Sequence, residues 1–146
     1  MRRPIRILAA DCRGVSALEF AIVAGVFLVL SFGVIELGLL WWTKNALQAT
    51  AALTARCAGL GACQCAAGAC TPAQFAVETA SAWVVTGVIG TADVTISSNV
   101  ACNGTPQTTH TSAAITSRFW ASDSLPPPFP STAISVSACF PTSTFN

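Results

Sequence analysis

A short stretch near the N-terminus carries the residues on which the chemistry of this chain is expected to depend. In the sequence RGVSALEF, Gly14 is followed by Val15 and then, at the fifth position after the glycine, by Glu19. Hydrolysis of the peptide bond after Gly14 would leave a new ammonium group on Val15. Because residues four apart lie on the same face of a helix, the Glu19 carboxylate can approach that ammonium in its own chain or in a neighbouring chain. Such an ion pair is much stronger in a low dielectric than at a wet surface.

A long apolar segment begins at this stretch. Sixteen uncharged residues, FAIVAGVFLVLSFGVI, separate Glu19 from Glu36, and the wider run from Val15 to Trp42 is interrupted only by those two glutamates. A helix over this run would be about 42 Å long at ~1.5 Å per residue, which exceeds the ~30 Å hydrocarbon layer of a bilayer. Charged residues make up only 9% of the 146 residues, too few for the surface of an ordinary soluble domain. The segment is therefore predicted to be one membrane-spanning helix in contact with the lipid bilayer.

The basic residues predict the orientation of this helix. Four arginines precede the apolar run against a single acidic residue, Asp11, whereas only Lys44 and Arg56 follow it closely. The four are Arg2, Arg3, Arg6 and Arg13. The positive-inside rule then keeps the N-terminus in the cytoplasm and exports the rest of the chain. Trp41 and Trp42 are typical of the interfacial aromatic belt at the outer face of the membrane.

Other interpretations of this region remain open. A buried core helix is one alternative to a membrane span, but the apolar run is too long for it and the charges on its two flanks are too asymmetric. A cleaved secretory signal peptide is a second alternative, with Ala49-Thr50-Ala51 as its small-x-small site. Against it, the apolar region is much longer than the ~7–15 residues of such peptides, and Glu36 lies before the candidate site. Glu19 itself has a simple alternative, that of an interfacial carboxylate with little energetic cost.

The combination of these features resembles a known family. A glycine, four residues, and then a glutamate followed by an aromatic residue, opening an apolar helix behind a short basic leader, are similar to the processing site of type IV prepilins. The phrase IELGLLWW and the alanine-rich continuation ALQATAALTARCAGL narrow the resemblance to the TadE-like minor pseudopilins of the tight-adherence (Tad, or Flp) pilus system. The resemblance covers residues 1–60 well and the remainder only loosely. Phe20 departs from the tyrosine that major Flp pilins commonly carry.

The resemblance implies roles, partners and a location. Gly14 and Val15 would form the processing site of a prepilin peptidase, and Glu19 and Phe20 would act in assembly or recognition. The implied partners are this peptidase, other pseudopilins, and the Flp pilin or the inner-membrane assembly platform. The implied location is the bacterial inner membrane, with one span, a cytoplasmic N-terminus and a periplasmic C-terminal domain. Entry into the pilus fibre is left open.

The cysteines give an independent indication of export. The chain has seven, and Cys12 precedes Gly14, so removal of residues 1–14 leaves an even set on the exported side. These six disulfide candidates are Cys57, Cys63, Cys65, Cys70, Cys102 and Cys139. Three disulfides would suit an oxidising periplasm. The sequence does not choose among the possible pairings, although Cys63 and Cys65 are too close together to pair readily with each other.

The same cluster, CAGLGACQCAAGAC, also admits a metal-binding interpretation. Its spacings lack the CxxC-like pairs of tetrahedral zinc sites, and the chain's one histidine, His110, is distant in the sequence. We therefore predict no metal and no cofactor, and we expect His110 to be a solvated loop residue. No catalytic constellation, phosphate-binding loop or basic patch is recognisable. The chain is accordingly predicted to be neither an enzyme nor a nucleic-acid-binding protein.

The predicted organisation has three parts: a basic leader over residues 1–14, a helix with an amphipathic continuation over 15–60, and an exported Cys-rich domain over 61–146. In the last part, Thr71-Pro72-Ala73-Gln74 is a capping box that predicts a helix from Pro72 to about Thr86. Its expected apolar stripe comprises Phe75, Val77, Ala80, Trp83 and Val84. Alternating segments predict strands over Asp93–Ser98, Ser112–Ala121 and Ala133–Phe140, with a turn at Asn103-Gly104 and a stiff connector over 125–130.

The fold class expected from these elements is α+β: a long N-terminal transmembrane α-helix followed by a small disulfide-stapled domain with a helix and a short antiparallel sheet. The function expected from the resemblance is that of a minor pseudopilin, processed by a prepilin peptidase and acting in Tad pilus assembly and hence in surface adherence. The alternative is a bitopic, signal-anchored protein whose disulfide-rich periplasmic binding domain is unrelated to a pilus.

Overall fold

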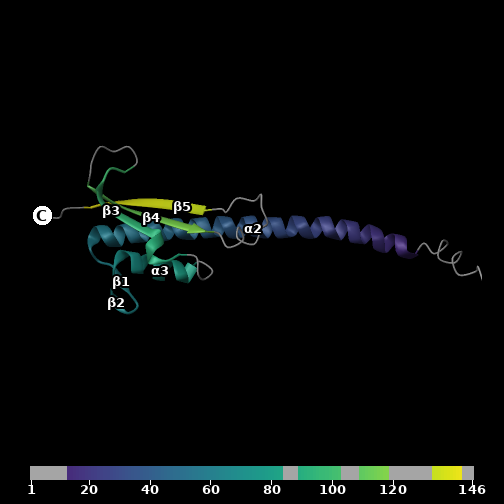
Figure 1. Ribbon diagram of the computed structural model, residues 1–146, viewed down its shortest axis with the longest axis horizontal. Helices are drawn as coiled ribbons and strands as arrows, with labels where there is room; N and C mark the ends of the chain where they lie inside the picture. The colour runs from purple at the N-terminus through teal and green to yellow at the C-terminus, as the bar shows by residue number, and fades with distance from the viewer. Residues whose placement is uncertain (1–12, 84–88, 103–108, 119–132, 143–146) are drawn as a thin grey trace, which may run out of the picture. The chain divides into compact units, whose positions relative to one another are not determined.

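The computed structural model describes residues 13–83, 89–102, 109–118 and 133–142 (Figure 1). A long helix, α2, is followed by a two-stranded hairpin, a second helix, a short 3-10 turn and a three-stranded sheet. In chain order the elements are α2 (Arg13–Leu60), β1 (Gln64–Cys65), β2 (Gly68–Ala69), α3 (Pro72–Trp83), η1 (Thr91–Asp93), β3 (Val94–Val100), β4 (His110–Arg118) and β5 (Ala133–Pro141). Both sheets are antiparallel, which confirms the predicted α+β class.

The chain divides into two packing units, Met1–Gly38 and Leu39–Asn146. In the first unit, no residue of α2 from Gly14 to Gly38 is buried, and most are exposed. The second unit holds the remaining part of α2 together with all the other elements. The predicted boundaries after residues 14 and 60 were drawn from expected processing and membrane topology. The division into packing units does not test them, so they stay predictions.

The C-terminal end of α2 is fixed by a Schellman motif. Gly61 adopts a left-handed conformation with φ of 63°, which glycine reaches without the steric cost that a Cβ atom would bring. Its N–H donates to the carbonyl of Ala58 at 3.3 Å, and the N–H of Ala62 donates to the carbonyl of Cys57 at 3.1 Å. These two bonds satisfy carbonyl groups that the end of a helix leaves unpaired. The sequence therefore stops the helix at Leu60 by local chemistry.

The three-stranded sheet is an up-and-down meander in the order β3-β4-β5. Ile115 of β4 pairs with Val94 of β3 on one side and with Val136 of β5 on the other, so the three apolar residues form a row across one face. The register of β3 against β4 shifts between Ser97 and Val100, where β3 carries one extra residue. Asn99 takes a φ of 59° there, as residues in β-bulges often do.

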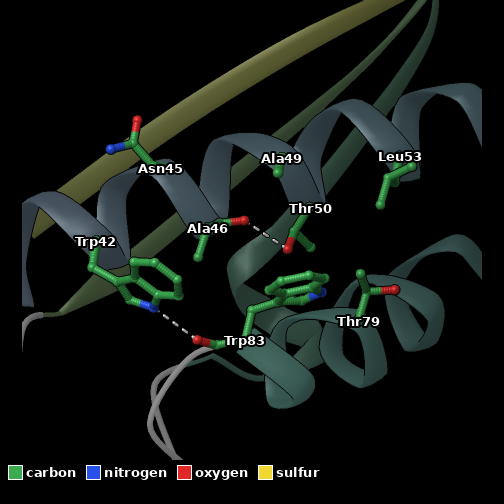
Figure 2. Close-up of a pocket in the computed structure, with 8 residues that line it drawn as sticks. All are labelled: Trp42, Asn45, Ala46, Ala49, Thr50, Leu53, Thr79 and Trp83. Carbon is green, nitrogen blue, oxygen red and sulfur yellow. Dashed lines mark hydrogen bonds between the residues drawn. The ribbon is translucent and has the colours of Figure 1, made fainter.

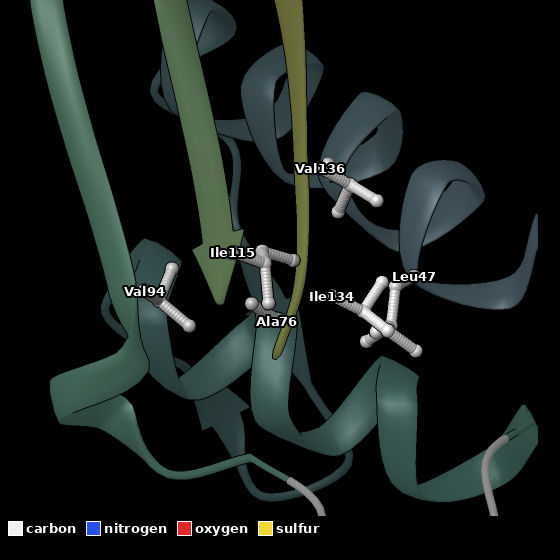
Figure 3. Close-up of a cluster of buried hydrophobic side chains, with 7 residues drawn as sticks. Leu47, Ala76, Val94, Ile115, Ile134 and Val136 are labelled. Atoms are coloured by element: carbon white, nitrogen blue, oxygen red, sulfur yellow. The ribbon is translucent and has the colours of Figure 1, made fainter. Parts of the chain in front are cut away.

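The hydrophobic core of the second unit lies where α2, α3 and this face of the sheet meet (Figure 3). Leu47 of α2 and Ile115 of β4 are the largest fully buried side chains among the described residues. The other core members are Ala51 of α2, Ala76 of α3, and Val94, Ile134 and Val136 of the sheet. Most of the buried positions on the two helices are small residues, which let the backbones approach closely.

The buried face of α2 also includes threonines, a residue type that is seldom found on the core-facing side of a helix. Thr43, Thr50 and Thr54 are buried, and each hydroxyl donates to the carbonyl four residues earlier at 2.8–2.9 Å. Because these hydroxyl groups are satisfied within the helix, their burial leaves no unpaired donor. The threonines therefore behave as small apolar residues toward the core.

The predicted capping box at the start of α3 is present. The N–H of Thr71 donates to Oε1 of Gln74 at 2.9 Å, and the N–H of Gln74 donates to Oγ1 of Thr71 at 3.3 Å. The helix begins at Pro72, as expected, and its described part ends at Trp83. The last three residues of the predicted helix, 84–86, lie outside the described residues.

The predicted apolar stripe of α3 was partly wrong. Ala80 is buried as expected, but the second fully buried position is Ala76, while Phe75 and Val77 are only half-buried and Trp83 is 59% exposed. The spacing of apolar residues in α3 is compatible with more than one buried face. The face that packs against α2 is the one with the smallest residues, because the two helices lie close together. Val84 lies outside the described residues.

The strands were predicted in the right order with shifted ends. The first begins at Val94 because Asp93 belongs to η1, where its Oδ2 accepts the N–H of Gly90 at 2.8 Å. The second begins at His110, which is half-buried and pairs with both Val100 and Pro141. The expectation that His110 lies in a solvated loop was therefore wrong. The predicted turn at 103–104, the connector over 125–130 and the end of the second strand at 119–121 lie outside the described residues.

Candidate functional site

The predicted processing site lies in the first turn of α2. Gly14 is exposed, and a Cβ atom added to it would meet no atom within 4 Å. Packing within this chain therefore does not require glycine at this position. Val15 is 53% exposed. The first N–H groups of a helix lack partners within the helix, so this turn is expected to open more readily than the middle of α2.

The predicted assembly residues lie one turn further along the same helix. Glu19 is exposed, and among the described residues no hydrogen bond or ion pair engages its carboxylate. Phe20 is 74% exposed. Glu36, near the other end of the apolar run, is exposed as well. The structure thus presents Gly14, Val15, Glu19 and Phe20 on one short exposed segment; in the uncut chain the nitrogen of Val15 is a neutral amide.

Between these glutamates, α2 exposes a large apolar surface, and contact of this surface with water is unfavourable. Among the described residues, α2 is the one helix long and apolar enough to cross a membrane, and no residue of its most apolar window is buried. The exposed large side chains there include Ile22, Val23, Val26, Phe27, Leu28, Val29, Leu30, Phe32, Val34 and Ile35. A contiguous surface of this size marks a contact with lipid or with another protein. These features are those of a membrane anchor.

The sequence of this helix also matches a known family. The model of the family described as TadE-like protein covers the chain from Gly14 to Arg56. Residues 14–56 are TadE-like. No curated protein and no solved structure gives a significant match to the chain. The family match confirms, for residues 14–56, the resemblance read from the sequence.

The TadE-like segment extends well into the folded second unit. Its part from Leu39 to Arg56 supplies Leu47, Ala51 and Ala55, all of which are fully buried. Gln48 also donates from Nε2 to the carbonyl of Ser137 at 2.9 Å, which ties the segment to β5. The family signature therefore includes the residues on which the C-terminal domain packs, as well as the exposed anchor.

The six cysteines that were predicted to form disulfides do so in three pairs. Cys57 pairs with Cys63 across the C-terminal end of α2, and Cys65 pairs with Cys70 around the β1–β2 hairpin. The third bond joins Cys102, just after β3, to Cys139 in β5. Because every one of these sulfur atoms is bonded to another, none can act as a thiolate ligand. Within the described part of the chain, no group of three or more histidine, cysteine or acidic side chains could hold a metal ion.

The β1–β2 hairpin, which the Cys65–Cys70 disulfide closes, is held against α3 by Glu78. Its Oε1 accepts the N–H of Ala66 in the hairpin turn at 2.9 Å. Gly68, the first residue of β2, has a φ of 111°, a conformation that residues other than glycine rarely adopt. The bond to Ala66 gives Glu78 a structural role.

One feature that sequence reasoning missed is an apolar groove between α2 and α3 (Figure 2). It has a volume of about 230 Å³ and its exposed surface is almost entirely apolar. Its lining residues are Trp42, Asn45, Ala46, Ala49, Thr50, Leu53, Thr79 and Trp83. The indole Nε1 of Trp42 donates to the carbonyl oxygen of Trp83 at 3.1 Å, across 41 residues of sequence. No local pattern could predict that pairing, because the two tryptophans meet only when α3 folds back on α2.

Proposed function

We propose that this chain is a minor pseudopilin of a Tad pilus assembly system. A prepilin peptidase removes residues 1–14, the exposed part of α2 holds the product in the bacterial inner membrane with its N-terminus toward the cytoplasm, and the disulfide-stapled domain lies in the periplasm. Through its anchor helix the protein associates with other pseudopilins, the Flp pilin or the assembly platform, and so contributes to surface adherence.

The observation that carries this proposal is the extent of the TadE-like match. It begins at Gly14, the residue after which processing is predicted, and it continues through the exposed apolar helix. Four arginines before this point and the sparse cations after it support the proposed orientation. The three disulfides support an oxidising compartment for the second unit.

The proposed mechanism assigns separate tasks to the two ends of α2. At the first end, cleavage creates an ammonium on Val15 next to the unpaired carboxylate of Glu19, which gives an assembling helix bundle a specific polar contact in an otherwise apolar surface. At the other end, α2 contributes Leu47 and Ala51 to the core of the exported domain, so that the anchor and this core share one helix.

The experiment is to determine the N-terminus of the protein in cells with and without the prepilin peptidase. Intact-mass analysis of membrane-purified protein should find Val15 as the first residue when the peptidase is present and Met1, or its trimmed form, when it is absent. Deletion of the gene for this chain should reduce piliation, and complementation with the intact gene should restore it. Protein that keeps residues 1–14 in the presence of the peptidase, with piliation unaffected by the deletion, favours the alternative of a signal-anchored binding domain.

A further inference from the structure

The three disulfides share one feature: each joins a cysteine of the described chain to the next one in the sequence. They are two short-range bonds, Cys57–Cys63 and Cys65–Cys70, and the long-range bond Cys102–Cys139, with separations of 6, 5 and 37 residues. Random pairing of six cysteines would give this set only about once in 15. Either the chain itself selects these pairs, or a catalyst must sort them after they have formed.

The first short-range bond closes around a turn that the chain forms locally. In the Schellman motif the N–H of Ala62 donates to the carbonyl of Cys57 at 3.1 Å, and the Cα atoms of Cys57 and Cys63 lie 4.8 Å apart. The motif needs the left-handed backbone of Gly61 and the alanine-rich end of α2 before it. Neither of these depends on α3 or on the sheet. The turn therefore brings the two thiols together before the rest of the domain has folded.

The second short-range bond closes the β1–β2 hairpin, which follows the end of α2 directly (Figure 1). Cys65 pairs with Gly68 in the ladder, and Cys70 comes immediately after β2. A loop of about 10 residues closes within roughly 10–100 ns, and this one is shorter, so its thiols meet often. Once the Schellman turn holds Cys63 against Cys57, the hairpin cysteines are the two thiols left in this part of the chain.

The long-range bond depends on the sheet. The meander aligns Val100 of β3, His110 of β4 and Pro141 of β5 in one row, and Cys102 and Cys139 each lie two residues from that row. Their Cα atoms are 6.3 Å apart as a result. In the folded sheet Cys139 is exposed and Cys102 is buried. An oxidant can therefore react with Cys139, and the neighbouring thiolate of Cys102 can then displace it.

The direction of export favours the same order. In the proposed orientation the N-terminus stays in the cytoplasm, so the residues that follow α2 reach the exported side before the strands do. The cysteines of the two short-range bonds are then exposed to an oxidant while the sheet is still incomplete. When the last two cysteines arrive, the other four are already paired.

We propose that this chain is a substrate of a thiol–disulfide oxidoreductase that acts only as an oxidant, and that its native disulfides form without a disulfide isomerase. The short-range bonds form first, and Cys102–Cys139 forms last. In each step one thiolate of the chain attacks the disulfide of the oxidant, and a second thiolate of the chain displaces the oxidant from the mixed disulfide. Two thiols thereby lose two electrons and two protons, and the oxidant takes up both and leaves as a dithiol. This inference rests on the proposed export, but it does not depend on pilus assembly.

The test uses the full chain with Cys12→Ser in detergent micelles, so that the six paired cysteines supply all of its thiols. The reduced protein is diluted from denaturant into buffer that contains the disulfide form of the oxidoreductase and no isomerase. Samples are alkylated at successive times, and mass spectrometry of fragmented peptic peptides assigns each bond. The short-range bonds should appear before Cys102–Cys139, and an added isomerase should leave the yield of the native set unchanged.

Two matched variants test whether the Schellman turn selects the first bond. Gly61→Val forces a side chain onto a left-handed backbone, which should lower the share of Cys57–Cys63 among the earliest bonds about tenfold. Ala62→Val adds the same side chain one residue later, at an exposed position with no left-handed backbone, and should leave this share unchanged. Because the share is read before the sheet forms, the comparison does not require that either variant reaches the native fold.

The outcomes separate this inference from the proposed export. Three results would overturn the inference alone: early formation of Cys102–Cys139, mispaired species that only an isomerase converts to the native set, or the same share of Cys57–Cys63 in both variants. They would leave the proposed export intact, because the reaction takes place with purified protein. Six free thiols in protein isolated from cells that contain an active oxidant would overturn the export and this inference together.

Discussion

Gly59 of α2 lies directly against the ring of Phe140 in β5: a Cβ atom added to the glycine would be 2.9 Å from Cδ1 of Phe140. This close approach occurs in the last turn of the helix, two residues before the left-handed Gly61. It lets the end of β5 pack on the end of α2 at the point where the Cys57–Cys63 disulfide also holds the chain. A side chain at position 59 would therefore require the Phe140 ring to move.

A larger residue at position 59 is expected to destabilise the second unit. Gly59→Val should cost about 1–3 kcal/mol, the usual range for overpacking, because the new methyl groups must displace Phe140. The measurement is thermal unfolding of the purified chain, followed by tryptophan fluorescence. Helix propensity cannot cause this loss, because valine is more favourable in a helix than glycine. A melting temperature equal to that of the unmodified chain would mean that the Phe140 ring moves aside freely.

Substitutions at Gly14 are expected to separate processing from folding. Since no atom lies within 4 Å of an added Cβ, Gly14→Ala should be cleaved and Gly14→Leu should remain uncut, while both keep their disulfides and their membrane insertion. Intact mass after expression with the peptidase distinguishes the two. Gly25→Leu introduces the same change at another open position of α2 and should be cleaved normally. Cleavage of Gly14→Leu at the wild-type position would show that the glycine is not required.

Loss of the Glu19 charge is expected to impair lateral association. Glu19→Gln keeps the size of the side chain, so insertion and cleavage should persist, but the new ammonium of Val15 would lack its counter-charge. Leaving one member of a buried ion pair unpaired costs about 3–5 kcal/mol. Co-purification or crosslinking with the other pilus components should therefore fall sharply.

Glu36→Gln is the matched control for this experiment. Glu36 is exposed on the same helix, but it lies near the opposite end and has no ammonium group to meet, so its replacement should have a smaller effect. Wild-type assembly and piliation in Glu19→Gln would identify Glu19 as an interfacial carboxylate only.

The three disulfides are expected to contribute unequally to stability. In the chain-entropy treatment, a crosslink contributes more when it closes a longer loop. The Cys102–Cys139 bond spans 37 residues and the Cys57–Cys63 bond spans 6. Paired substitution by alanine should then cost about 4 kcal/mol for the first bond and about 2 kcal/mol for the second.

Thermal unfolding of the two paired variants gives the order of the losses, and alkylation of the unmodified mature protein should detect no free thiol. A larger loss for the Cys57–Cys63 pair would indicate that its position at the end of α2, where it holds the Schellman turn, outweighs loop length. Two or more alkylatable thiols in the exported protein would contradict the three-disulfide arrangement itself.

Several features of this protein follow from the sequence because their causes are local. The apolar run between Glu19 and Glu36 specifies a helix that only lipid or another protein can cover, whatever follows it in the chain. The capping box at Thr71 and Gln74 fixes the start of α3 through two bonds within four residues. Alternation of apolar and polar residues likewise predicts the strands that contain Val94, Ile115 and Val136.

The tertiary structure decided everything that depends on segments distant in the sequence. The spacing of the cysteines did not reveal their partners, because pairing requires the Cα atoms to lie within reach, and for Cys102 and Cys139 that distance of 6.3 Å exists only once the sheet has formed. Ala76 is buried in place of Phe75 because α2 presents a close-packed face of alanine and threonine. The groove with its Trp42–Trp83 hydrogen bond exists because α3 folds back on α2. Periodicity shows that a helix has an apolar face, but the shape of the neighbouring surface determines which residues that face buries.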